Sequence, residues 1–323
     1  MLDAMGMTRT VLITMATAAA LTLAGCSGAD PSPGVARSTT ATPAPAPSDR
    51  SSPSSPSAVP TADAATAGAF AALEERSDAR VGVVAIDTAD GAGVGYRADE
   101  RFPFASTNKV FIAAAVLDAS SSADLDAVVH YGRGDLLAYA PVTRQHVDEG
   151  MTVRALVDAA VRRSDNTAAN LLVQRLGGVD GVTRWLRGIG DDVTRVDRVE
   201  PELNTALPGD PRDTTTPARS AADLRAVLVG DALDPDDRDL LRSAMAGTTT
   251  GDGTIRAGVP GGWSVADKTG TASSGVRNDI AVVRPPGRDP IVLVVFTVRD
   301  RTGAEPSDAL VAAATRVAVQ RVG

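Results

Sequence analysis

The chain has 323 residues, a formal net charge of −8 and an isoelectric point near 4.9. This acidic balance provides no basic footprint for nucleic acid, so nucleic acid is not an expected partner. The single cysteine excludes an intramolecular disulfide, and because aromatic residues make up only 3% of the chain, alanine, valine and leucine must fill the core.

Residues 1–25 are predicted to be an export signal. Arg9 precedes an apolar run from Val11 through Ala24, which is too short to span a bilayer. The run ends in Leu23-Ala24-Gly25-Cys26, which resembles the lipobox of bacterial lipoproteins, where the cysteine becomes lipidated. An ordinary signal peptide with an incidental cysteine is the alternative.

Residues 26–61 are rich in serine, proline, alanine and threonine, with almost no large apolar side chain. Such a composition predicts a disordered tether. A folded domain is expected over residues 62–323, and the tether would let it stand off a membrane to which Cys26 is anchored.

The predicted elements of this domain form strands at both ends and helices between them. A first helix over 62–78 precedes a hairpin of strands 81–87 and 94–97, with its turn at Asp90-Gly91. Apolar residues at helical spacing, together with turn signals, then predict the following segments: helices 152–163, 166–176, 179–187, 220–230 and 235–246, strands 264–268, 279–284 and 291–298, and a last helix 307–322. This order predicts an α/β (α+β) fold in which one antiparallel five-stranded sheet from both termini is flanked by helices and carries an inserted all-helical part.

Ser106 and Lys109 stand immediately before Val110–Leu117, a segment in which every residue is apolar. A helix that is hydrophobic all round is expected to run through the middle of a domain. Residues three apart are neighbours on a helix, so a hydroxyl and an amine would meet near unpaired backbone N–H groups. This combination offers a nucleophile, a base and an oxyanion site. In the alternative, Ser106 only caps the helix and Lys109 extends to solvent.

Lysine occurs only twice, at Lys109 and Lys268, whereas arginine supplies the other 30 basic side chains. A guanidinium stays protonated in proteins, but burial can bring an ammonium to release its proton. Lysine at only two positions suggests that these two sites need a basic group that can release its proton, which arginine cannot do.

Two further motifs follow, Ser164-Asp165-Asn166 and Lys268-Thr269-Gly270. Taken singly, the first could cap a helix and the second could end a strand. Together with Ser106-Thr107-Asn108-Lys109, in this order, they resemble the signature that class A β-lactamases share with penicillin-binding proteins. The resemblance extends from about Ala62 to Gly323 and implies the serine β-lactamase and D,D-peptidase fold.

The segment from Arg198 to Asn204 resembles the omega loop of class A β-lactamases. The resemblance implies that Glu200 is the base for deacylation, that Asn204 helps to hold the hydrolytic water, and that Arg198 and Asp213 form the ion pair at the ends of the loop. The resemblance also implies a cis bond between Glu200 and Pro201, which the tertiary amide of proline makes less costly. An acidic, proline-containing surface loop is the alternative.

The same resemblance implies further roles around a substrate. Ser164 would relay a proton to the leaving nitrogen, with the positive charge of Lys268 nearby, and the backbone N–H groups of Ser106 and Thr271 would form the oxyanion hole. The implied substrate-binding residues are Tyr139 as an aromatic gatepost, Asn166, Asn204, Thr269, Gly270, Thr271 and Arg277, of which Thr269, Thr271 and Arg277 would face a substrate carboxylate. Tyr139 could instead be a half-buried core residue, and Arg277 a solvated one.

Histidine and metal chemistry have little support in the sequence. His130 and His146 are the only histidines and lie outside the motifs, and no cluster of ligands suggests zinc. No metal and no cofactor are therefore expected.

These residues predict an exported, monomeric, lipid-anchored class A serine β-lactamase, held at the outer face of the bacterial cytoplasmic membrane or in the periplasm. It would act on small-molecule β-lactams through an acyl-enzyme, and either Lys109 or Glu200, through a water, would take the Ser106 proton. One alternative is a D,D-peptidase or penicillin-binding protein, which would not need the Glu200 loop. Another is a non-catalytic β-lactam sensor, which would be acylated once and remain so.

Overall fold

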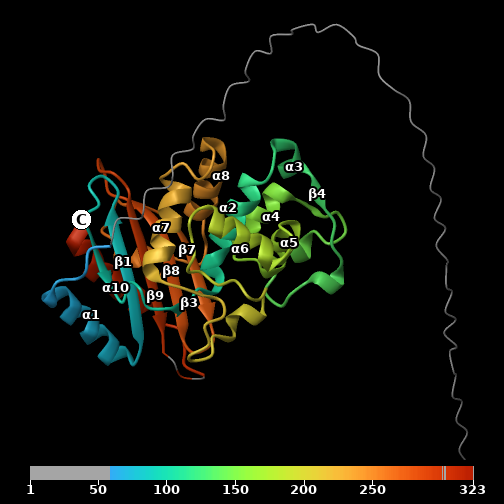
Figure 1. Cartoon of the computed structure of the whole chain (residues 1–323). Coiled ribbons are helices and arrows are strands. Elements are labelled where there is room, and N and C mark those ends of the chain that lie inside the picture. Colours follow the sequence, from blue (N-terminus) through green and yellow to red (C-terminus); the bar gives the residue numbers. More distant parts are fainter. Residues whose placement is uncertain (1–58, 300, 302, 323) are drawn as a thin grey trace, which may run out of the picture. The chain divides into compact units, whose positions relative to one another are not determined.

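Five strands form one antiparallel sheet in the order β2-β1-β9-β8-β7 (Figure 1). The computed structural model describes residues 59–299, 301 and 303–322, so the predicted export signal, Cys26 and most of the tether lie outside the described residues. The strands are β1 (Arg80–Asp87), β2 (Gly93–Tyr96), β7 (Ser264–Ala272), β8 (Val276–Arg284) and β9 (Ile291–Val298). The prediction of a five-stranded antiparallel sheet from both ends of the domain is confirmed.

Strand β9 is buried on both faces. Because successive side chains of a strand point to opposite faces, Ile291, Leu293 and Val295 enter one core, and Val292, Val294 and Phe296 enter the other. A strand that is apolar on both faces must be covered on both. In the sheet, β9 lies between β1 and β8.

Helices α1 (Ala64–Ser77) and α10 (Asp308–Val322) cover one face of the sheet. The other face carries α7 (Pro217–Leu228) and, beyond it, the inserted helical part. There α2 (Lys109–Asp118) packs against its neighbours, which are α4 (Val153–Arg162), α5 (Asn166–Arg175), α6 (Val179–Gly188) and α8 (Pro235–Ala246). Residues 110–117 of α2 are all buried, so the prediction of a central apolar helix is confirmed.

The structure corrects the start of that helix. Ser106 lies in a 3₁₀ turn, Ala105–Asn108, and α2 begins only at Lys109. Within this turn, Ala105 lies in the left-handed region, at a φ of 50°. Ser106 and Lys109 nevertheless meet, because residues three apart also align in a 3₁₀ helix.

Several other boundaries differ from the predicted ones. Helix α7 begins at Pro217 rather than at 220, because Thr216 accepts the amide hydrogen of Arg219 and proline suits the first helical position. Strands β7 and β8 extend to Ala272 and from Val276, where they pair with each other as a hairpin. Short elements were not predicted, since they are too short for a periodic pattern: β3 (Phe102–Pro103), β6 (Thr214–Thr215), β4 (Val128–Val129), β5 (Met151–Thr152), α3 (Ser122–Asp126) and α9 (Ile255–Gly258).

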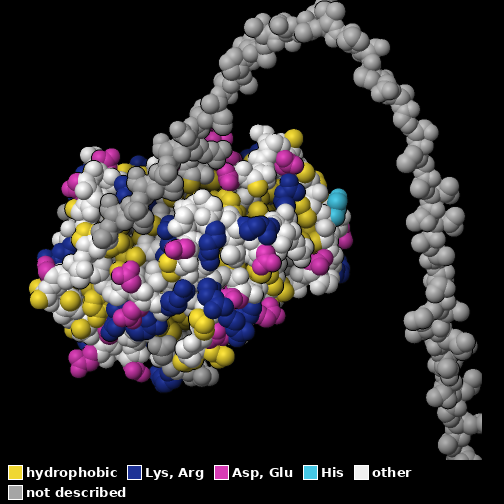
Figure 2. All heavy atoms as spheres, viewed as in Figure 1, with side chains coloured by type: hydrophobic (Ala, Val, Ile, Leu, Met, Phe, Trp, Pro, Cys, Tyr) yellow, Lys and Arg dark blue, Asp and Glu magenta, His cyan; other side chains and the backbone are white. Residues whose placement is uncertain are grey.

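Acidic and basic side chains are interspersed over the face shown in Figure 2. Within the part of the chain that the structure describes, none of the helices has both the length and the apolar character needed to cross a membrane.

Candidate active site

A cleft of about 330 Å³ lies where the helical part meets the edge strand β7. It is lined by residues from separate stretches of the chain, namely Ser106, Tyr139, Ser164, Asn166, Asn204, Thr250, Thr269, Thr271 and Arg277. The fold therefore brings the three motifs and the Glu200 loop (residues 198–213) to one place. Of these lining residues, the sequence did not predict Thr250, whose hydroxyl contacts that of Thr269 at 2.6 Å.

Strand β7 passes close to the backbone that carries Ser106. A Cβ at Gly270 would lie 2.8 Å from the carbonyl oxygen of Phe104 and 3.2 Å from the amide nitrogen of Ser106. Any side chain at this position would push the strand away from the nucleophile. Gly270, predicted to bind substrate, does not line the cleft and instead permits this close approach.

Lys109 is the centre of the polar network. Its Nζ donates to Ser106 Oγ at 3.0 Å, to the carbonyl oxygen of Ser164 at 2.9 Å and to Asn166 Oδ1 at 2.6 Å, and it forms an ion pair with Glu200 Oε1 at 2.9 Å. The Lys109 side chain is only 2% exposed, so the alternative in which it extends to solvent is wrong. Burial lowers the pKa of Lys109 below its usual range, and the negative charge of Glu200 opposes part of that shift.

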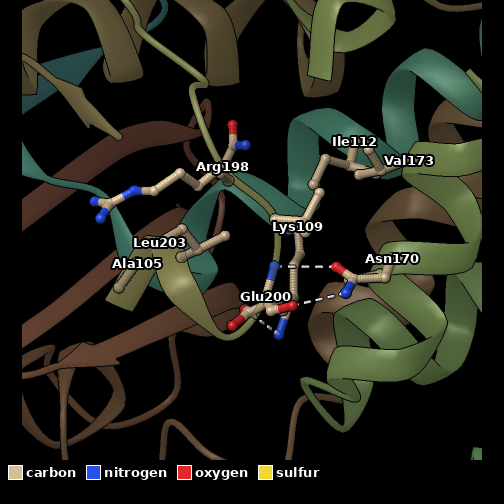
Figure 3. Close-up of a pocket in the computed structure, with 11 residues that line it drawn as sticks. Ala105, Lys109, Ile112, Asn170, Val173, Arg198, Glu200 and Leu203 are labelled. Atoms are coloured by element: carbon tan, nitrogen blue, oxygen red, sulfur yellow. Dashed lines mark hydrogen bonds and ion pairs between the residues drawn. The ribbon is translucent and has the colours of Figure 1, made fainter. Parts of the chain in front are cut away.

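Glu200 is held by both its side chain and its backbone. Its Oε1 accepts from Ser106 Oγ at 3.2 Å, and its Oε2 accepts from Asn204 Nδ2 at 2.5 Å. The Asn170 side chain accepts from the Glu200 backbone N–H at 3.0 Å and donates to its carbonyl at 2.8 Å (Figure 3). Glu200 is buried, so the alternative of a plain surface loop does not hold for this residue.

Asn170 was not predicted from the sequence. It lies one helical turn after Asn166 in α5, and this spacing is the signal that could have identified it, since residues four apart share a helix face. Its role in holding Glu200 depends on a loop 30 residues away, which no local pattern reveals.

Arg198 and Asp213 close the Glu200 loop. Arg198 Nε donates to Asp213 Oδ2 at 2.6 Å, and Asp213 Oδ1 accepts the backbone N–H groups of Asp197 at 2.9 Å and Arg198 at 3.0 Å. The predicted ion pair is present, and the Glu200–Pro201 peptide bond is cis, as expected.

Ser164 lies between the two lysines. Its Oγ accepts from Lys268 Nζ at 3.0 Å and lies 3.4 Å from Lys109 Nζ. Burial, followed by the nearby charge of Lys109, lowers the pKa of Lys268 well below its usual range. A continuous path of hydrogen-bonding groups thus runs from Ser106 through Lys109 and Ser164 to Lys268.

Asp165, between Ser164 and Asn166, has the structural role that the sequence offered as the alternative interpretation of this motif, a helix cap. Its carboxylate caps α5 by accepting from the N–H of Ala168 at 2.9 Å, and it accepts from the N–H groups of Val142 and Thr143, both at 2.9 Å. These bonds fix the loop that carries Tyr139, which is 50% exposed at the cleft.

Arg277 is held at the cleft and is not a freely solvated residue. Its side chain is bound to Asp308 Oδ1 at 2.5 Å, to Thr271 Oγ1 at 3.0 Å and to the carbonyl oxygen of Thr250 at 2.9 Å. With Thr269 and Thr271, it forms a polar wall that could bind an anionic group.

The histidines lie apart from this cleft. His130 is exposed, and His146 pairs with Glu149. Among the described residues, the structure groups no set of three or more histidine, cysteine or carboxylate side chains that could bind a metal ion.

A buried serine, two buried lysines and a glutamate around one cleft are the arrangement of a serine acyl-transfer enzyme. The model of the beta-lactamase enzyme family matches residues 65–322. The chain belongs to this family, and the structures it resembles place it in class A.

Similar proteins cover most of the chain. It is 53% identical over 268 residues to a beta-lactamase of Amycolatopsis lactamdurans, across 83% of this chain and 88% of that protein. It is 50% identical over 272 residues to beta-lactamase AST-1 of Nocardia asteroides, across 82% of this chain and 88% of that protein. Among solved structures, the beta-lactamase of Desulfarculus baarsii superposes with a TM-score of 0.79 at 47% identity, covering 80% of this chain and 98% of that one.

The structure predicts that Asp213, rather than the loop's other carboxylates, keeps the Glu200 loop closed. Replacing Asp213 by alanine removes acceptors from two backbone N–H groups and leaves Arg198 without its buried partner, which should destabilise the loop by about 3 kcal/mol. Hydrogen–deuterium exchange across residues 195–214 should therefore become faster.

Asp210→Ala is the matched control, because Asp210 forms an ion pair in the same loop with Arg212, whose side chain is exposed. Equal exchange rates in the two variants would contradict the role assigned to Asp213.

Proposed function

We propose that this chain hydrolyses the amide bond of β-lactams through an acyl-enzyme on Ser106. The observation that carries the proposal is the network joining Ser106, Lys109, Ser164, Glu200 and Lys268 at one cleft. The named relatives support it, since they are beta-lactamases at about 50% identity across most of the chain.

Acylation begins when Ser106 Oγ attacks the lactam carbonyl and loses its proton. Ser106 Oγ donates to Glu200 Oε1 and accepts from Lys109 Nζ, so Glu200 is the direct acceptor while Lys109 is charged. Lys109 could take the proton only as the free amine, and burial makes this state more accessible by lowering the pKa of Lys109. The N–H groups of Ser106 and Thr271 would stabilise the oxyanion.

Collapse of the tetrahedral intermediate breaks the C–N bond, and the leaving nitrogen must gain a proton. Ser164 is the donor in this proposal, and it is resupplied from Lys109 or Lys268, both of which donate toward its Oγ. Lys109, 2.9 Å from Glu200, then takes the Ser106 proton from Glu200, so both lysines and the Glu200 carboxylate are restored before deacylation. The polar wall of Thr269, Thr271 and Arg277 binds the substrate carboxylate, while Tyr139 and Asn166 line the rest of the cleft.

Deacylation needs a water molecule activated beside the acyl-enzyme. Glu200 accepts its proton, with Asn204 as the second polar group, and the hydroxide attacks the ester carbonyl. The ester C–O bond then breaks, and the proton returns to Ser106. The enzyme is thereby regenerated for another turnover.

We also propose that the chain is exported and held by a lipid at Cys26, with residues 26–61 as a tether for the domain 62–323, and that it acts as a monomer. The leader and its Leu23-Ala24-Gly25-Cys26 ending support the anchor. A Cys26→Ser variant should move from the membrane fraction to the soluble fraction of the producing cells. An unchanged distribution would contradict the anchor.

Steady-state hydrolysis of a chromogenic cephalosporin in large excess tests the proposed activity. The chain should complete many turnovers per molecule. A burst of one equivalent followed by no further product would instead indicate a penicillin-binding protein or a sensor.

Glu200→Ala should separate the two half-reactions, because Lys109 remains in contact with Ser106 and can accept its proton in acylation. Because the variant lacks the base for water, deacylation should slow by about 10³-fold and the acyl-enzyme should accumulate, which intact mass spectrometry detects as a covalent adduct. Ser106→Ala should form no adduct. Rapid release of the acyl group by Glu200→Ala would contradict the role of Glu200.

A further inference from the structure

A small cavity lies beneath the Glu200 loop, separate from the cleft. It has a volume of about 10 Å³ and is lined by residues of the 3₁₀ turn and α2, of α5, and of the loop (Figure 3). The cavity and the cleft have no lining residue in common. Lys109 and Glu200 line the cavity and bind cleft residues, so their ion pair lies between the two spaces.

Asn108 lines this cavity with an unusual side chain. It is 2% exposed, and neither its Oδ1 nor its Nδ2 has a hydrogen-bond partner in the protein. Buried amides are almost always hydrogen-bonded, because losing water without a replacement costs free energy. A fully buried amide without a partner at this position therefore needs an explanation.

The size of the cavity suggests the missing partner. About 10 Å³ is the lower limit for a single water molecule, and a buried water needs two to four polar partners. The Asn108 amide can supply two of them, an acceptor and a donor.

We propose that Asn108 binds one internal water molecule in this cavity and thereby acts as a positioning residue for the loop that carries Glu200. The ends of the loop are fixed by Arg198 and Asp213, and Glu200 itself by Asn170. Between these points, Val199 and Leu203 line the cavity. The bound water would fill the space between Asn108 and this part of the loop, and so support the loop from below.

The consequence for catalysis rests on the proposed function of Glu200. Deacylation requires Glu200 and a water to be aligned, and an error of about 1 Å in such alignment can cost about 10²-fold in rate. Acylation is less dependent on the exact position of Glu200, because Lys109 also contacts Ser106 and can take its proton, and Lys109 is fixed by Ser164 and Asn166 as well. Loss of the internal water should therefore slow deacylation selectively.

Asn108→Leu tests this inference, because it keeps the approximate volume but removes both polar atoms. In an acyl-enzyme mechanism kcat/KM reports acylation, whereas kcat also reports deacylation. We expect kcat and KM to fall together by about 10-fold with kcat/KM unchanged. Asn108→Ser, which retains a hydroxyl for the water, should recover most of the lost kcat.

Val173→Ala is the matched control. Val173 lines the same cavity from α5, and its truncation alters packing without removing a polar atom. It should lower the melting temperature but produce no joint fall of kcat and KM. If Asn108→Leu instead raises the melting temperature and leaves kcat unchanged, the amide has no bound partner and the proposal is wrong.

A crystal structure of the unmodified protein decides the same question without catalysis. An ordered water within about 3.2 Å of both amide atoms of Asn108 is expected. A resolved cavity without such a water would overturn the proposal. If the protein failed to turn over β-lactams, only the proposed function would fall, and the water site would still be decided by this structure.

Discussion

The buried ammonium of Lys109 is the interaction on which the site depends. A charge inside a protein is costly unless oxygens replace its water, and here Ser106, Ser164, Asn166 and Glu200 all supply them. These partners come from the 3₁₀ turn, the segment leading into α5, and the Glu200 loop. The hydrogen-bond and ion-pair partners of this one ammonium therefore bring three distant stretches of the chain together.

The fold supplies the rigid frame for this meeting. Helix α2 is fixed by its apolar surroundings, so the side chain at its first residue is fixed as well. On the other side β7 is held by its pairing with β8, and Gly270 lets it approach the Ser106 backbone. Lys268 then extends from β7 to Ser164, which joins the sheet to the helical part through the reacting groups themselves.

The sequence predicted most of the fold and of the reacting groups, for identifiable physical reasons. The alternation and apolar runs of the strands and the helical periods are strong local signals, and the use of lysine at only two positions singled out Lys109 and Lys268. The sequence did not predict the 3₁₀ turn or the two-residue strands, because elements this short cannot show a periodic pattern of apolar residues. Asn170 and the buried state of Asn108 were missed because they depend on contacts with the distant Glu200 loop, which no local pattern encodes.

The most direct test of this account uses the scarcity of lysine. A chain labelled with ¹³C at lysine Cε should give only two side-chain NMR signals, from Lys109 and Lys268, whose pKa values can be read by titration. Both lysines are expected to titrate below the ordinary value of 10.5, and Glu200→Gln should lower the pKa of Lys109 further by removing the charge that stabilises its ammonium. Titration of both lysines at or above 10.5 would mean that neither is buried as described, and would contradict the account.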